Sequence, residues 1–179
     1  MRIRRRPFTL VTLALMVMVA LGAGTHLDFD WTRTLDPEDA EHASIVFVCQ
    51  NGVAMSVWSA LTFNRLAAER GLQVRAISRS AAPTLTHVPL RMKLALALDG
   101  YRVGDYMPEV ISAGEVHSAS RVILISTELP QSASGAGAAI EQWDGFPPMR
   151  EQYFESRAAL LTRVEELVAR LTISADRSP

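Results

Sequence analysis

The feature that most constrains this chain is a short apolar run that ends in its only cysteine and leads into a segment with helical spacing. Residues 45–48 read Ile-Val-Phe-Val, which is typical of a buried strand, and Cys49 follows directly. Residues 57–68 carry an apolar helical face, with Ser56 placed to cap the helix and Gly71 to end it. This order predicts that Cys49 lies under a helix N-terminus, where unpaired N–H groups bind anions and favour a thiolate. The alternative interpretation of Cys49 is a small buried apolar side chain.

The rest of the chain alternates between strand-like and helix-like segments. The expected strands are 73–77, 121–126 and 139–143, and the expected helices are 89–98, 112–119 and a long final helix that starts at residue 149 or 150. This alternation predicts an α/β fold: an open, mostly parallel sheet of about four strands with helices on both faces. In such folds the site lies at the carboxyl ends of the strands, which is where Cys49 stands.

Two of the expected helices have a distinct apolar face. In the helix 89–98, one face carries Leu90, Leu94, Ala97 and Leu98. In the final helix, a stripe with helical spacing is predicted to be buried, and it consists of Leu160, Leu161, Val164, Leu167, Val168 and Leu171.

Composition excludes several classes of protein. With 179 residues, 49% of them hydrophobic, the chain suits one globular domain, and a net charge of −1 argues against a nucleic-acid partner. One cysteine excludes an intrachain disulfide and any relay of several thiols. The four histidines show no ligand spacing, so we expect no metal site, and no cofactor is implied; they are His26, His42, His87 and His117.

The first 43 residues differ in composition from the rest. Residues 1–25 have a basic start and an uncharged apolar run, 8–24, that ends in Gly-Ala-Gly, which predicts a signal peptide or, if it is retained, an N-terminal membrane anchor. Both alternatives predict export to a periplasmic or other extracytoplasmic location, with membrane contact only through this segment. Residues 26–43 are expected to form an acidic linker, 44–174 the folded domain and 175–179 a tail.

The strand, cysteine and helix together resemble the low-molecular-weight protein-tyrosine phosphatases and the arsenate reductases built on the same fold. In that family a first strand ends in cysteine, five residues follow, and an arginine and then a serine or threonine open the helix. Here Cys49 is followed by residues 50–54, then by Met55 and Ser56. The resemblance continues to about residue 171, and it implies the family's open four-stranded α/β fold.

The resemblance also implies roles for individual residues. Cys49 would be the nucleophile that forms a covalent thiophosphoryl intermediate, Ser56 would donate a hydrogen bond to its thiolate, and Asp144 is the candidate acid for the leaving group. The backbone of the loop would hold a phosphate-like or other oxyanion, and its residues are Gln50, Asn51, Gly52, Val53, Ala54 and Met55.

The chain departs from the family pattern at functional positions. Met55 replaces the arginine, which removes a charged bidentate donor, so we expect very weak phosphatase turnover or none. Asp144 lies earlier than the family's Asp-Pro pair, because the expected aspartate position holds Pro147. The aromatic pair that follows Asp-Pro in tyrosine phosphatases is absent, which removes support for phosphotyrosine selectivity.

Three hypotheses therefore remain open. The first is an exported phosphatase-like enzyme with Cys49 as nucleophile and reduced chemistry. The second is a non-catalytic descendant that binds an anion or a protein partner. The third is a single-cysteine redox protein for thiols or arsenate, against which export counts, since small-molecule reductants are scarce outside the cytoplasm. The first two differ in whether another cation replaces the missing guanidinium, and the candidates are Arg79, Arg91, Lys93 and Arg150.

Overall fold

The computed structural model describes residues 44–134 and 137–175. The predicted segments 1–25 and 26–43 and the last four residues of the predicted tail lie outside this part of the chain. The elements in order are β1 (Ile45–Cys49), α3 (Met55–Glu69), β2 (Ala76–Ser80), α4 (Leu90–Leu98), α5 (Ala113–Ser118), β3 (Arg121–Ile125), the 3-10 helix η2 (Gln131–Ala133), β4 (Ala139–Trp143) and α6 (Tyr153–Ala175). Within the described ranges, no helix combines the length and the apolar character needed to cross a membrane.

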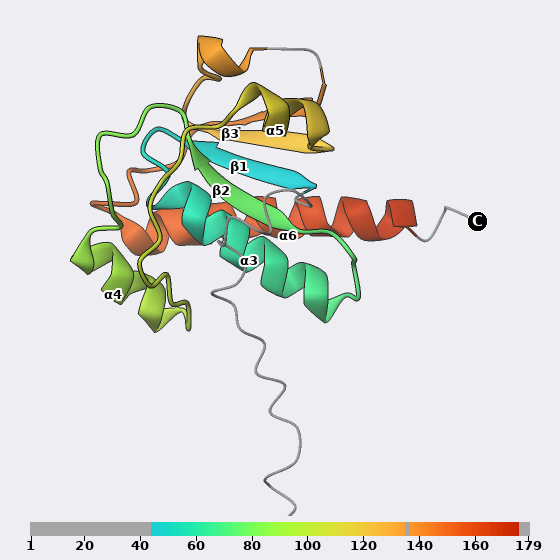
Figure 1. Ribbon diagram of the computed structural model, residues 1–179. Coiled ribbons are helices and arrows are strands. Elements are labelled where there is room, and N and C mark those ends of the chain that lie inside the picture. Colours follow the sequence, from blue (N-terminus) through green and yellow to red (C-terminus); the bar gives the residue numbers. More distant parts are fainter. Residues whose placement is uncertain (1–43, 135–136, 176–179) are drawn as a thin grey trace, which may run out of the picture. The chain divides into compact units, whose positions relative to one another are not determined.

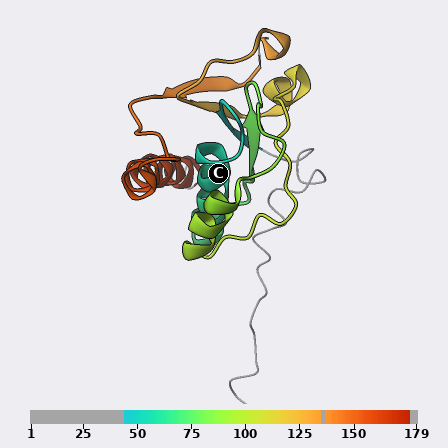
Figure 2. The same cartoon turned by 90° about the vertical axis from the view of Figure 1, so that its left-hand side faces the viewer.

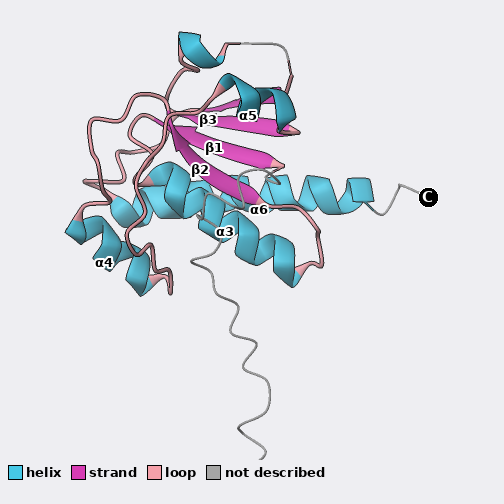
Figure 3. Cartoon of the chain, viewed as in Figure 1, coloured by secondary structure: helices cyan, strands magenta, loops and turns pink. Residues whose placement is uncertain are grey.

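The four strands form one parallel sheet in the order β2-β1-β3-β4. Helices α3 and α6 lie on one side of this sheet, and α5 lies on the other (Figures 1 and 2). The predicted open α/β sheet of four strands with helices on both faces is therefore confirmed. The loops that follow β1, β2 and β4 gather at the same end of the sheet (Figure 3), as parallel strands require.

The central strand β1 pairs with β2 on one edge and with β3 on the other, and it is buried on both faces because a hydrophobic core lies on each side of the sheet. Ile45, Phe47 and Cys49 point into the larger core with α3 and α6, whereas Val46 and Val48 belong to a second core on the α5 side. A strand covered on both faces reads as a continuous apolar run rather than an alternating one. The same alternation sends the Cys49 side chain towards α3.

Strand β2 starts later than the sequence predicts. It covers Ala76–Ser80 instead of residues 73–77, so Ser78 and Ser80 belong to the strand and not to a loop. Its polar residues pair in register with apolar ones, Phe47 with Ser78 and Cys49 with Ser80. The prediction failed because it relied on apolar residues to mark buried strands. The serines of this strand are buried with their hydroxyl groups hydrogen-bonded, and such polar residues leave no apolar pattern.

The starts of two helices also differ from expectation. Helix α3 begins at Met55 with Ala54 at the N-cap position and no side-chain cap, so the predicted capping role of Ser56 is wrong. Helix α6 begins at Tyr153, later than residue 149 or 150. Its apolar stripe is buried as predicted: Leu160, Val164, Leu167 and Val168 are in the core, and Leu161 and Leu171 pack against it.

Helix α4 presents its leucines to solvent. Leu90, Leu94 and Leu98 share one face, as their spacing predicts, but they are 73%, 61% and 77% exposed. The buried residues of this helix are Met92 and Leu96, on the opposite side. The described part of the fold thus leaves an apolar strip uncovered along the outside of α4.

Asp99, directly after α4, joins three helices. Its Oδ2 accepts hydrogen bonds from Trp58 Nε1 of α3 at 2.7 Å and from Tyr153 OH and Arg157 Nε of α6, both at 2.8 Å. Burial and the bond to this carboxylate raise the pKa of Tyr153, which keeps its hydroxyl protonated as a donor. One carboxylate therefore fixes α4 against the two helices that cover the sheet.

We expect Asp99→Ala to lower the free energy of unfolding by about 2–4 kcal/mol, because three donors lose a charged acceptor at once. Urea unfolding followed by tryptophan fluorescence measures this change. Asp105→Ala is the matched control, since Asp105 is exposed in the loop after α4. Equal losses for the two variants would show that Asp99 does not join the helices energetically.

Candidate functional site

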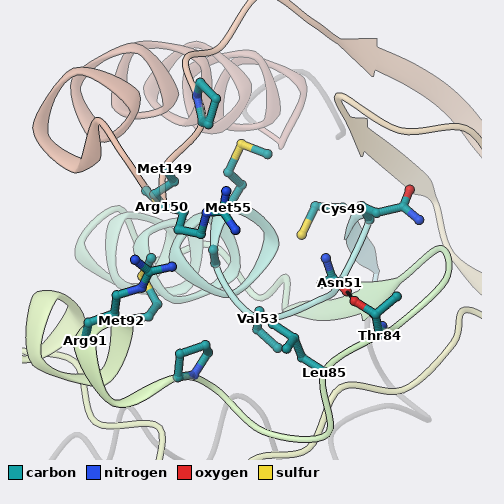
Figure 4. A pocket seen from close by; sticks show the side chains of 14 residues that line it. Cys49, Asn51, Val53, Met55, Thr84, Leu85, Arg91, Met92, Met149 and Arg150 are labelled. Carbon is teal, nitrogen blue, oxygen red and sulfur yellow. Dashed lines mark hydrogen bonds between the residues drawn. The ribbon is translucent and has the colours of Figure 1, made fainter.

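A pocket of about 430 Å³ opens at the carboxyl end of β1 (Figure 4). One wall is formed by the strand end and loop: Cys49, Gln50, Asn51, Val53, Ala54 and Met55. The other walls come from Thr84 and Leu85 after β2, from Pro89, Arg91 and Met92 at the start of α4, and from Pro148, Met149 and Arg150 before α6. Three segments that are distant in sequence thus meet around the only cysteine.

Cys49 is only 4% exposed, yet its side chain borders this pocket. Its Sγ lies 3.0 Å from Ser56 Oγ in the first turn of α3. The Oγ of Ser56 also accepts a hydrogen bond of 2.9 Å from Ser78 Oγ in β2. Because that acceptor site of Ser56 is filled by Ser78, its own proton is available to the sulfur when Cys49 is a thiolate.

Tyr106 extends this row of hydrogen bonds. Its hydroxyl donates to Ser78 Oγ at 3.3 Å and to the Ser78 carbonyl at 3.2 Å. Burial raises the pKa of Tyr106 to about 12, so the hydroxyl stays protonated at neutral pH and acts as a donor. The donors Tyr106, Ser78 and Ser56 therefore point in one direction, and the row ends at the sulfur of Cys49.

The loop between β1 and α3 offers its backbone to the pocket. Within the part of the chain that the structure describes, the N–H groups of residues 51–57 donate to no protein acceptor. They include the first N–H groups of α3, which no side chain caps. Unpaired N–H groups at a helix N-terminus beside a pocket are suited to hold an oxyanion.

Contacts with neighbouring segments fix the shape of this loop. Gly52 has φ +64, and a Cβ on it would lie 3.0 Å from Ser80 Cβ, so a larger residue does not fit there. Ser80 Oγ donates to the Gln50 carbonyl at 2.7 Å. Asn51 Oδ1 accepts from the Thr84 N–H and from the Thr84 hydroxyl, at 2.8 and 2.7 Å. These contacts therefore hold the loop between β1 and α3 in place without a bound ligand.

The charged side chains that line the pocket are positive. Among the described residues that line it, only Arg91 and Arg150 are charged, and in the view of Figure 4 they lie on one side of the pocket with Cys49 on the other. Arg150 also pairs with exposed Glu151 at 2.9 Å, a weak interaction in solvent. Met55, which is partly buried, stands where the family pattern has arginine and brings no donor.

The other two candidate cations are engaged elsewhere. Arg79 is buried and forms ion pairs with Glu115 at 2.6 Å and Glu109 at 3.3 Å. Lys93 donates to the Gly104 carbonyl at 2.6 Å. Neither of them lines the pocket, so the positive charge at this site comes from Arg91 and Arg150.

Asp144 does not line the pocket. It follows β4, is exposed, and its Oδ1 accepts a hydrogen bond of 3.0 Å from Gln142 Nε2. Its role as an acid remains a prediction. Among residues 44–134 and 137–175, no three His, Cys, Asp or Glu side chains come together in a group that could hold a metal ion.

Sequence reasoning missed several residues of this site. Ser78 and Tyr106 reach Cys49 through hydrogen bonds from another strand and a loop, and no local pattern marks them. Met92 of α4 and Leu85 of the loop after β2 also line the pocket, and their spacing in the sequence does not indicate it. The only signal available was topological, since residues after neighbouring parallel strands meet at one end of the sheet.

No family model and no curated protein matches the sequence. Solved structures do match the fold. YfkJ from Bacillus subtilis aligns with a TM-score of 0.63 at 18% identity, covering 76% of this chain and 97% of that one. A low-molecular-weight protein tyrosine phosphatase from T. tengcongensis aligns at 0.58 and 15% identity, over 72% and 99% of the two chains.

A thioredoxin-dependent arsenate reductase from Corynebacterium glutamicum aligns at 0.58 and 17% identity, over 81% of this chain and 71% of that one. Identities this low establish the fold and leave the activity open. The chain has the fold shared by the low-molecular-weight protein tyrosine phosphatases and the arsenate reductases built like them.

Proposed function

We propose that the loop 50–56 binds a tetrahedral oxyanion and that Cys49 is a nucleophile in slow hydrolysis of phosphate monoesters. The observation that carries this proposal is that the thiol and several residues of a loop with unpaired N–H groups line one pocket, and that its only charged lining residues in the described part of the chain are Arg91 and Arg150. Donors and positive charge without a carboxylate select an anion. The fold that the chain shares with tyrosine phosphatases and arsenate reductases supports the same ligand class.

The chemistry takes two displacement steps. The Cys49 thiolate attacks phosphorus, an S–P bond forms, and the bond from phosphorus to the ester oxygen breaks. The departing oxygen takes a proton from an acid, for which Asp144 is the candidate, and water then attacks phosphorus and releases phosphate and the thiolate. Ser56, 3.0 Å from the sulfur, supports the negative charge on the thiolate when it departs.

Met55 limits the rate of this chemistry. A thioether cannot donate to the equatorial oxygens as a guanidinium does, and the loss of one well-placed donor costs about 3–4 kcal/mol of transition-state stabilisation. Arg91 and Arg150 attract an anion to the mouth of the pocket, but they lie outside the loop that grips it. The geometry therefore supports binding more strongly than turnover.

Hydrolysis of an aryl phosphate by the full-length chain tests this proposal. We expect near-background turnover in the parent, none in Cys49→Ser, and a gain of about a hundred- to a thousandfold in Met55→Arg, which restores a guanidinium donor in the loop. Met107→Arg is the matched control, since Met107 is 60% exposed and does not line the pocket. Fast turnover in the parent together with no effect of Met55→Arg would refute the role assigned to Met55.

A second experiment tests whether Arg91 and Arg150 attract the anion. Cys49 is the only cysteine, so its alkylation by iodoacetamide reports on this site alone, and bound inorganic phosphate should slow it. We expect Arg91→Ala and Arg150→Ala each to raise the phosphate concentration for half-protection about threefold, with a larger effect at low salt. Arg102→Ala, an exposed arginine outside the pocket, should change nothing.

The second hypothesis, a protein that binds an anion without turning it over, predicts the same protection by phosphate. It differs from the first in the Met55→Arg result, because a site without residual catalysis gains no Cys49-dependent hydrolysis from the added charge. The third hypothesis, thiol or arsenate redox chemistry with an external thiol, is supported only by the presence of Cys49 beside an anion loop.

The N-terminal residues support a further proposal, that the protein is exported and that residues 8–24 are either cleaved as part of a signal peptide or kept as an anchor. The basic start and the apolar run of 17 residues are the features that support it. N-terminal sequencing of the protein from the periplasmic and membrane fractions of a bacterial host distinguishes the two forms. Recovery of the whole chain, with its N-terminus intact, in the cytosol would contradict export.

A further inference from the structure

The lining of the pocket suggests which phosphate esters fit it. Beyond the loop that faces the anion, the walls consist largely of aliphatic and thioether side chains: Leu85, Pro89, Met92, Pro148 and Met149. None of the described residues that line the pocket is aromatic. We propose that the site selects phosphate monoesters of aliphatic, apolar alcohols over aromatic ones, an inference that rests on the proposed function of the Cys49 loop.

The volume of the pocket leaves room for an organic group. About 430 Å³ is within the range of about 300–1,000 Å³ of small-molecule sites and exceeds what a bare oxyanion fills. The oxyanion is expected beside Cys49 and the N–H groups of the loop. The remaining space is bounded by apolar walls that the anion does not use.

The side chains of the pocket walls become more exposed from the inside of the pocket towards its rim. Met149 and Met92 are 2% and 5% exposed, whereas Leu85 is 40% exposed and forms part of the rim. Methionine is unbranched and adaptable, so two thioethers can pack along a flexible alkyl chain. An aromatic ester would find no ring with which to stack in an offset or edge-to-face arrangement.

The first turn of α4 contributes Arg91 and Met92 to the lining. The exposed leucines of this helix, Leu90, Leu94 and Leu98, lie on the side away from Met92 and do not line the pocket. The preference is therefore expected to depend on the part of the alkyl chain that the pocket itself holds.

Protection of Cys49 from iodoacetamide in the full-length chain tests this inference with soluble esters. Methyl, butyl and hexyl phosphate form a chain-length series, and phenyl phosphate matches hexyl phosphate in carbon number. Each fully buried methylene strengthens binding about fourfold. We expect half-protection by hexyl phosphate at a concentration at least tenfold below that of methyl phosphate and clearly below that of phenyl phosphate.

A substitution at the rim of the pocket tests whether the effect of alkyl-chain length on affinity arises in this pocket. Leu85→Ser should reduce the ratio of affinities for hexyl and methyl phosphate about threefold or more, and because this is a ratio within one variant, it does not depend on a small loss of stability. Ile140→Ser is the matched control, since Ile140 is 49% exposed on β4 and does not line the pocket. It should leave the ratio unchanged.

The outcomes separate this inference from the proposed function. If inorganic and methyl phosphate protect Cys49 but protection does not improve with chain length, or phenyl phosphate binds as well as hexyl phosphate, the aliphatic preference is wrong and the anion site stands. If none of the phosphates protects Cys49, the proposed function fails and the inference fails with it. A chain-length effect that Leu85→Ser and Ile140→Ser alter equally would also overturn the assignment to this pocket.

Discussion

The structure depends on β1, a five-residue strand that is buried on both faces and hydrogen-bonded on both edges. Its pairing with β2 and β3 leaves no freedom in where the chain emerges, and its alternation decides that Cys49 points towards α3. The cysteine therefore occupies its place because the hydrophobic core fixes the strand. The sulfur is buried, but it stands at the one end of the strand where loops from the neighbouring strands also emerge.

The positively charged side chains at this site stand at different positions from those in the family pattern. In that pattern a guanidinium in the loop would grip the anion directly, whereas here the loop holds Met55 and the two pocket arginines stand on α4 and before α6. Charge at the mouth raises the local concentration of anions and their rate of association. Charge in the loop would stabilise the transition state, because it would be fixed at hydrogen-bond distance from the reacting phosphoryl group. In this chain the attraction of anions to the pocket is retained, and the stabilisation of the transition state by a charge in the loop is lost.

Much of the fold was predictable from the sequence, and the reasons are specific. Residues 45–48 and 121–126 were identified as strands because apolar runs in a parallel sheet are unbroken, and β1 and β3 lie there. Residues 139–143 were also expected to form a strand and do form β4, although Glu141 and Gln142 interrupt their apolar character. The start of β2 was misplaced because Ser78 and Ser80 are buried by hydrogen bonds rather than by apolar character. The leucines of α4 share the face that their spacing predicts, but this face is exposed to solvent. Spacing along a helix does not reveal which face the rest of the protein covers.

Only the part of the candidate site that is built from residues adjacent in the sequence could be predicted. The loop beside Cys49 could be located from the sequence, but Ser78 and Tyr106, which reach Cys49 through hydrogen bonds, come from distant segments that no local pattern marks. Arg91 and Arg150 were named among four candidate cations, but only the fold shows which of the four line the pocket. One local prediction failed in an informative way. Ser56 was expected to cap α3, and instead its hydroxyl bonds to the sulfur of Cys49, while Ala54 at the N-cap position offers no acceptor.

An uncapped helix start usually lowers stability by about 1 kcal/mol relative to one capped by Ser, Thr, Asp or Asn. In this chain the hydroxyl nearest to the helix start is directed to sulfur, and the N–H groups of residues 51–57 donate to no described protein acceptor, in a loop of which residues 51 and 53–55 line the pocket. An oxyanion bound there would satisfy those donors and provide the negative charge that a capping carboxylate supplies in other helices. Binding of the anion and completion of the α3 terminus are thus one physical event, which is why the geometry favours an anion-binding loop even with methionine in the place of arginine.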